Sequence, residues 1–234
     1  MTHEPTHRIE RPIMRQDWRA LTYIHWPFRA EAVQALLPSD LQVDTFDGLA
    51  WVGLVPFRME NVAARSTPAI PYFGTFPESN VRTYVRGGDG PGVWFLSLDI
   101  SRLLPVVIAR ATYRLPYMWA KMEIVERNNS ITYEMSRRWP RPVSRSRLEV
   151  EIGERIAEPT DFEHFLSARW RLYTMLGRKL AFARVDHEPW PLHRATAKSD
   201  DQLMSAAGFT PPDSQPHVMY SPGVSVRIDR PRYV

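Results

Sequence analysis

Arginine, tyrosine and glutamate side chains recur in this sequence at positions where they could act together on a small anionic molecule. If residues 78–86 are extended, Glu78, Arg82 and Tyr84 point to one side of a strand, because side chains alternate between its two faces. Arginine presents a planar fork of donors that suits carboxylates, and glutamate can act as a general acid or base. The other members of this set are Arg19, Arg110, Tyr113 and Tyr117.

Such residues at the mouth of an apolar interior would suit a small organic acid or carbonyl compound. A polar strand face that simply meets solvent is the alternative, and the spacing alone leaves both open.

Lysine is scarce and cysteine is absent. Of the 30 basic residues, only Lys121, Lys179 and Lys198 are lysines. Schiff-base chemistry needs an amine, and arginine keeps its proton, so these three side chains are the candidates for it. The lack of cysteine excludes disulfides, thiolate nucleophiles and cysteine-bound metals.

Motifs for other common chemistries are missing from the sequence. His187 and His193, with Glu188 nearby, come nearest to a metal site, but no H-E-x-x-H occurs. The G-x-S-x-G turn of serine hydrolases and a phosphate-binding GK[ST] loop are also absent. We therefore predict neither a metal nor another cofactor.

The segment between Arg137 and Arg147 supports a second hypothesis. It holds five arginines and two prolines in eleven residues around Trp139, a composition typical of an exposed loop. Arginines could grip phosphates while the indole stacks on a base, so a nucleic-acid or protein interaction module is the alternative function. A net charge of +4 is mild for 234 residues, which disfavours a nucleic-acid partner.

The elements that must position these residues are mostly strands. Alternation predicts a strand over residues 18–26, with Arg19 and His25 on one face and Trp18 on the other, ended by Pro27. Residues 49–57 are apolar on both faces and should be buried on both sides. Further strands are expected over residues 78–86, 93–98, 117–122, 169–173, 180–185, 217–220 and 224–228.

Helices and turns complete the predicted domain. Thr160 and Glu163 fit the capping box of a helix over residues 161–167. Hairpin turns are expected at Asp47-Gly48 and Asn128-Asn129. Short helices are expected over residues 28–37, 101–115 and 199–207, and a loop that could cover a pocket over residues 60–77.

These patterns predict a single α+β domain over residues 1–234, with residues 1–14 as a flexible polar leader. The sequence has neither a charged-then-apolar leader nor an unbroken apolar run of about 18 residues, so we expect a soluble cytoplasmic protein without a membrane partner. The sequence leaves the oligomeric state open, and a homo-oligomer is possible.

Several phrases of the sequence resemble one known family. They are LLPSDLQVDTFDGLAWVGLVPF, FPESNVRTYV, PGVWFLSLDISRLLPVVIARATYRLPY, FLSARWRLY and HEPWPL. In this order they resemble the uncharacterised YqjF-like family of the acetoacetate decarboxylase-like superfamily, over residues 16 to 228. The resemblance implies a strongly curved, mostly antiparallel β-cone or barrel around a deep pocket, with a few outer helices.

The resemblance also implies roles for individual residues. In true acetoacetate decarboxylases an arginine of the first strand, two glutamates and a lysine line the pocket, and the lysine forms a Schiff base with the keto acid. The resemblance puts Arg19 on that arginine, Glu78 on the second glutamate and Gly53 near the first. Tyr117 and Met118 stand where the family has two lysines.

Without an amine at that point, the resemblance implies a pocket that does not use a Schiff base. Lys121 would lie four residues beyond Tyr117, roughly 13 Å away along a strand. The candidates for catalysis are Arg19, Glu78 and Tyr117. The candidates for substrate binding are Arg82, Tyr84, Arg110, Tyr113, Trp119 and His187. If the protein is an enzyme, the expected activity is that of a lyase, hydratase or isomerase on a small keto or carboxylic acid.

Overall fold

The computed structural model describes residues 5, 7–65, 67–68, 74–102, 116–139 and 143–234. The helix predicted over residues 101–115 falls almost entirely outside the described residues, and so do Arg110 and Tyr113. The strands are β1 (Met14–Arg29), β2 (Gln42–Val43), β3 (Thr45–Phe46), β4 (Leu49–Ala64), β5 (Phe76–Gly87), β6 (Gly90–Ile100), β7 (Tyr117–Arg127), β8 (Ser130–Trp139), β9 (Arg145–Arg155), β10 (Arg171–Leu176), β11 (Lys179–His187), β12 (His193–Asp201), β13 (His217–Ile228) and β14 (Arg232–Tyr233).

The helices described are short and lie outside the sheet. They are α1 (Ala30–Gln34), α3 (Asp161–Ser167) and α4 (Leu203–Ala206). In the described ranges, none of them has the length and apolar composition needed to cross a bilayer.

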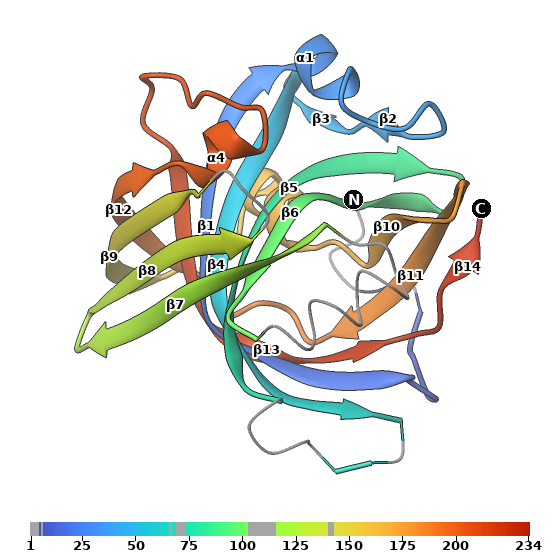
Figure 1. The fold of residues 1–234 in the computed structure, drawn as a ribbon, viewed down its shortest axis with the longest axis horizontal. Coiled ribbons are helices and arrows are strands. Elements are labelled where there is room, and N and C mark those ends of the chain that lie inside the picture. The colour runs from blue at the N-terminus through green and yellow to red at the C-terminus, as the bar shows by residue number, and fades with distance from the viewer. Residues whose placement is uncertain (1–4, 6, 66, 69–73, 103–115, 140–142) are drawn as a thin grey trace.

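The sheet closes on itself twice, because two strands each pair with different neighbours at their two ends. The order β6-β7-β8-β9-β12-β13-β1-β4-β5 returns to β6, which gives a nine-strand circuit. The order β13-β1-β4-β5-β6-β10-β11 returns to β13, which gives a seven-strand circuit. Figure 1 shows the seven-strand circuit on the right, with β7, β8, β9 and β12 wrapping away to the left.

Most neighbouring strands are antiparallel, as predicted, and β6 makes the parallel pairings, with β7 and β10. The five strands that the two circuits share form a common wall. This wall explains why residues 49–57 are apolar on both faces: Val52 to Phe57 are all buried. One apolar cluster, which includes Tyr23, Phe57 and Ile100, packs on one side of the wall. A second cluster, which includes Ile24 and Leu54, packs on the other side.

The first strand contains a bulge that the alternating pattern does not reveal. Ala20 has a φ of 49°, in the left-handed region that residues with a side chain seldom adopt. The pairing of β1 with β4 shifts register between Arg19 and Ile24. The predicted common face of Arg19 and His25 is therefore wrong, since the extra residue brings Trp18 to the His25 side and turns Arg19 away.

Several predicted boundaries also need correction. Pro27 does not end the first strand, because β1 continues to Arg29 with Pro27 opposite Trp51. Of the segment expected to be an arginine-rich loop, residues 137–139 lie in β8 and residues 145–147 lie in β9. The helix expected over residues 199–207 is reduced to α4, because β12 pairs with β9 as far as Asp201.

Local signals were more dependable. The turns at Asp47-Gly48 and at Asn128 are present, with positive φ values that such turns require. The capping box of α3 is present in both directions between Thr160 and Glu163. The polar leader is anchored where it approaches the barrel, because Ile9 is buried and its amide donates to an Asp186 carboxylate oxygen at 3.0 Å.

Candidate functional site

A cavity of about 420 Å³ lies inside the seven-strand circuit. All seven strands contribute to its wall, together with Tyr117 at the start of β7. Most of the wall is apolar. The polar side chains on it include Gln16, Tyr23, Glu78, Asn80, Arg82, Tyr117, Ser167, Arg169, Arg171, Thr174, His187 and Asp229.

The polar face predicted for β5 is turned into this cavity and not toward solvent. Glu78, Asn80 and Arg82 all line the cavity and are each less than one tenth exposed. Tyr84, the next residue in the alternation, is fully buried behind them. The alternation that the sequence predicts therefore builds one side of a buried polar site.

Arg82 carries a positive charge into the wall of the cavity without a carboxylate partner among the described residues. Its Nη2 donates to the Leu166 carbonyl at 3.3 Å, and its guanidinium lies 5.2 Å from the ring centroid of Tyr23. The Nε–H is buried and has no hydrogen-bond partner. Outside the described residues the sequence contains one acidic residue, Glu4.

A buried hydrogen-bond chain supports Arg82 from behind. The Tyr84 hydroxyl donates to the Leu166 carbonyl at 2.6 Å, so the His25 Nε2–H must donate to the Tyr84 oxygen across 2.7 Å. Burial holds the pKa of His25 well below its ordinary value, and the positive charge of Arg82 adds to this effect. His25 therefore stays neutral and fixes the position of Tyr84.

The His25 ring occupies the space beside Gly53. A Cβ atom at position 53 would lie 2.2 Å from His25 Nε2, so the chain has room for glycine there and for nothing larger. This is the position near which the resemblance puts the first glutamate of acetoacetate decarboxylases. The imidazole thus fills space beside the strand where that family carries a carboxylate.

A second buried arginine, Arg169, also lies near the Tyr84 ring. Arg169 donates to an Asp44 carboxylate oxygen at 2.7 Å and to the Phe165 carbonyl at 2.7 Å. Its guanidinium also lies 4.7 Å from the centroid of the Tyr84 ring. Arg169 is thus paired with Asp44, which also binds Arg86, whereas Arg82 has no carboxylate partner among the described residues.

Glu78 is a buried carboxyl group that favours its neutral form. Desolvation raises its pKa to about 8; the Asn80 side chain opposes this rise and the carboxylate of Asp99 adds to it. The Glu78 Oε2 and Asn80 Oδ1 atoms are buried without a hydrogen-bond partner. At neutral pH the carboxyl group therefore mostly holds its proton and can donate it.

Tyr117 and His187 complete the polar lining that the sequence predicted. Burial raises the pKa of Tyr117 well above its ordinary value, and the nearby Glu78 contributes to this rise. His187 lies among tryptophans, with Trp170 4.6 Å and Trp190 5.0 Å away between ring centroids. Burial lowers its pKa to about 4, so the imidazole is neutral at pH 7. Its Nδ1–H donates to the Glu188 carbonyl at 2.7 Å, which makes Nε2 an acceptor.

Three of the predicted site residues lie elsewhere. Arg19 lines a separate surface depression beside Trp170 and Glu188, and its Nη2 is 3.6 Å from an Asp17 carboxylate oxygen. Tyr84 supports the site from behind and does not line the cavity. Trp119 packs under the guanidinium of Arg138 at 5.3 Å and does not line it either.

Sequence reasoning missed Tyr23, Arg169 and Trp190 as members of the site. Alternation put Tyr23 on the face opposite Trp18, whereas the bulge at Ala20 brings both of them to the cavity. The phrases FLSARWRLY and HEPWPL, which contain Arg169 and Trp190, were the available signals for these two residues.

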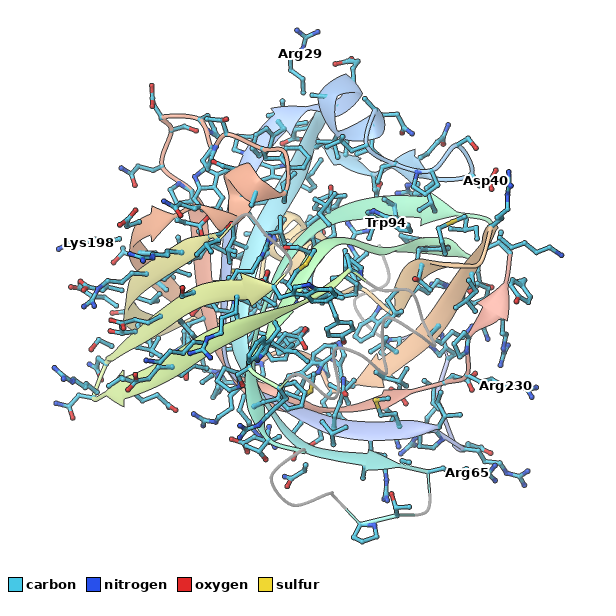
Figure 2. The ribbon with its side chains drawn as sticks, in the orientation of Figure 1. Arg29, Asp40, Arg65, Trp94, Lys198 and Arg230 are labelled. Atoms are coloured by element: carbon cyan, nitrogen blue, oxygen red, sulfur yellow. The ribbon has the colours of Figure 1, made fainter. Side chains whose placement is uncertain are left out.

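All three lysines are described, and all three are exposed. None of them lines the cavity. Lys198 projects away from β12 at the left edge of the molecule, far from the seven-strand circuit (Figure 2).

Two arginines of the arginine-rich stretch, Arg137 and Arg147, pair with carboxylates. Arg137 is buried and makes a bidentate ion pair with Asp99, at 2.7 and 2.8 Å. Arg147 pairs with Glu134 and with Glu149. Within the described chain, no group of three His, Asp or Glu side chains is arranged to hold a metal ion.

The fold defined by these circuits is that of the acetoacetate decarboxylase-like proteins. Acetoacetate decarboxylase from Legionella pneumophila superposes with a TM-score of 0.70 at 15% identity, covering 98% of this chain and 92% of the decarboxylase. An acetoacetate decarboxylase-like enzyme from Sphingomonas wittichii RW1 gives 0.65 at 13% identity, with 97% and 94% covered. The enduracididine biosynthesis enzyme MppR, complexed with pyruvate, gives 0.67 at 10% identity, with 97% and 92% covered.

Within this fold the sequence identifies the family. Residues 15–225 match DUF2071, described as an uncharacterized conserved protein. The uncharacterized protein YqjF of Bacillus subtilis is 36% identical over 211 residues, which cover 89% of this chain and 87% of YqjF. The chain belongs to the DUF2071 family.

Proposed function

We propose that this protein binds a small organic acid or carbonyl compound in the cavity of the seven-strand circuit, with a carboxylate group at Arg82. The observation that carries this proposal is the buried guanidinium of Arg82, which faces the cavity without a carboxylate partner among the described residues. An isolated buried charge is strongly unfavourable, and a carboxylate is the planar anion that matches its fork of donors.

Glu78 and Tyr117 are placed to donate hydrogen bonds to an oxygen atom of the ligand. Glu78 is mostly protonated at neutral pH, and Tyr117 lines the cavity near it. Both groups can donate to a carbonyl or hydroxyl oxygen. Donation by a neutral acid to a carbonyl oxygen favours enolisation or hydration, so these are the reaction types that the site would support.

We propose that this chemistry does not use a Schiff base. The exposed positions of Lys121, Lys179 and Lys198, none of which lines the cavity, support this view. The pyruvate bound to MppR supports the wider proposal, since it is an organic acid held by a protein of this fold.

Calorimetric titration with a panel of monocarboxylates, each beside its uncharged amide, tests the proposal. We expect at least one carboxylate to bind the parent and to bind Arg82→Gln at least tenfold more weakly, because a charge-assisted bond contributes about 1.5–3 kcal/mol. Arg127→Gln, at an exposed position, is the matched control and should bind as the parent does. Equal affinity of Arg82→Gln and the parent for every carboxylate would refute the proposal.

Borohydride reduction with pyruvate or acetoacetate, followed by mass spectrometry, tests the chemical part. No lysine adduct is expected at substrate concentrations that saturate the cavity. A reduced adduct on Lys121 would overturn the claim.

A further inference from the structure

The wall of the cavity between its polar groups is apolar and already buried. Leu21, Phe57, Met59, Phe76, Ile100 and Val185 line it, and none of them is more than 7% exposed. Protein interiors normally leave few voids larger than a water molecule. These side chains therefore surround a space that the described chain does not fill, and apolar spaces of this kind take up apolar molecules.

The size of the cavity exceeds the needs of a short keto acid. Its volume of about 420 Å³ corresponds to about fourteen water molecules at about 30 Å³ each. A three-carbon keto acid has six non-hydrogen atoms and would displace a minority of that water. A carboxylic acid of about eight to twelve carbons matches the volume at ordinary packing.

Arg82 and the mouth of the cavity lie at different ends of the barrel interior. Arg82 lies beside the fully buried residues Tyr23 and Tyr84 and under α3. The opposite end is formed by partly exposed residues, among them Met14 and Ile228. Between these ends, β4 and β6 line the cavity with apolar side chains, among them Phe57, Met59 and Leu98, whereas β5 adds Glu78 opposite Phe57.

We propose that the ligand is an amphipathic monocarboxylate of about eight to twelve carbons, straight-chain or aromatic, whose carboxylate binds Arg82 and whose apolar body fills the cavity toward its mouth. The inference rests on the proposed function, since it assumes the carboxylate site at Arg82. It adds the chemical class of the ligand, because two- to four-carbon acids would leave most of the apolar wall without contacts.

A chain-length series tests the inference. Straight-chain carboxylates from acetate to tetradecanoate, kept below their micelle concentrations, are titrated against the parent by tryptophan fluorescence. Affinity should rise about fourfold with each added methylene, up to eight to twelve carbons, and then stop rising. The alcohol of each chain length is the matched probe without charge.

Variants that reduce the volume sharpen the test. Ala183 lines the cavity from β11, so Ala183→Leu should move the length of tightest binding to shorter chains. Val55→Leu, on the opposite wall, should do the same and serves if Ala183→Leu does not fold.

The outcomes separate the two proposals. Binding that depends on Arg82 but does not change with chain length would overturn this inference and leave the proposed function standing. Chain-length dependence that is equal in the parent and Arg82→Gln would overturn the proposed carboxylate site. An optimum that both cavity variants leave unmoved would place the chains outside this cavity and overturn the inference.

Discussion

Glu78 and Arg82 lie on the same face of β5, about 13 Å apart at their Cα atoms by the usual strand rise, and make no ion pair with each other. The carboxyl group is neutral at pH 7 because burial raises its pKa to about 8. The guanidinium keeps its charge, as arginine does in proteins. Among the described residues that line the cavity, Arg82 is therefore a cation without a carboxylate partner and Glu78 a neutral acid, a combination that favours a monoanionic guest.

Replacing Arg82 by methionine should abolish carboxylate binding without destabilising the free protein. The Leu166 carbonyl would keep its bond from Tyr84, so no acceptor is orphaned, and an unpaired buried charge is removed. We expect a free energy of unfolding in urea that is unchanged or higher by about 1–3 kcal/mol.

Arg169→Met is the matched control for this change. Arg169 is also buried, but it is paired with the buried Asp44, so its loss should lower the free energy of unfolding by about 3–5 kcal/mol. If Arg82→Met is destabilised as much as Arg169→Met, the role of Arg82 is structural.

Glu78 should make the stability of the protein depend on pH in an unusual direction. The folded state holds the Glu78 proton up to about pH 8, whereas the unfolded chain releases it near the ordinary value of 4.5. Unfolding between these values releases a proton, so the free energy of unfolding falls as pH rises from about 5 to 8, on the order of 2–4 kcal/mol.

Glu78→Gln isolates this effect, since it lacks the titrating group and leaves the other groups in place. Urea unfolding of both proteins at pH 5, 6.5 and 8 should show the parent losing stability relative to the variant as pH rises. Parallel profiles would mean that Glu78 ionises in its ordinary range.

Gly53→Ala should disturb the support of the site. The added Cβ would lie 2.2 Å from His25 Nε2, and the imidazole cannot move away without losing its bond to Tyr84. We expect a loss of about 1–3 kcal/mol in the free energy of unfolding and weaker carboxylate binding.

Gly88→Ala is the comparison for Gly53→Ala, because its Cβ would meet the exposed terminal Val234 side chain, which is free to shift. A Gly53→Ala protein as stable as Gly88→Ala would show that His25 is not held in place.

Asp99→Asn should reveal that the arginine-rich stretch is structural. The substitution leaves the Arg137 guanidinium buried without its bidentate carboxylate, at an expected loss of about 3–5 kcal/mol in the free energy of unfolding. Arg147→Gln, which breaks exposed pairs, should leave the stability nearly unchanged. Similar effects of the two substitutions would contradict the assignment.

The sequence was informative where a signal is local. The turn at Asp47-Gly48, the capping box of Thr160 and the alternation along β5 each depend on residues a few positions apart, and each is present. Charge-bearing residues were harder to place. The bulge at Ala20 turns the Arg19 side chain away from the interior of the barrel. The hydrophobic periodicity of the sequence does not predict such a bulge.

Long-range pairing explains the remaining differences. Arg137 and Asp99 are 38 residues apart, so no local pattern predicts that this arginine of β8 is buried and paired with a carboxylate. The sheet closes twice because β6 and β13 each pair with more than two strands. Composition does not predict which strands these are. Alternation along residues 78–86 was enough to propose Arg82 as a site residue. The preference for Arg82 over Arg19 as the anion-binding residue required the observed register of β1 against β4.

The most direct test is a crystal structure of the protein with 10-bromodecanoate, whose bromine can be located by anomalous scattering. The account predicts the carboxylate oxygens within about 3 Å of the Arg82 guanidinium nitrogens, and the bromine toward the Met14 and Ile228 end of the cavity. A carboxylate bound beside Arg19 in the surface depression, with the cavity of Arg82 unoccupied, would contradict it.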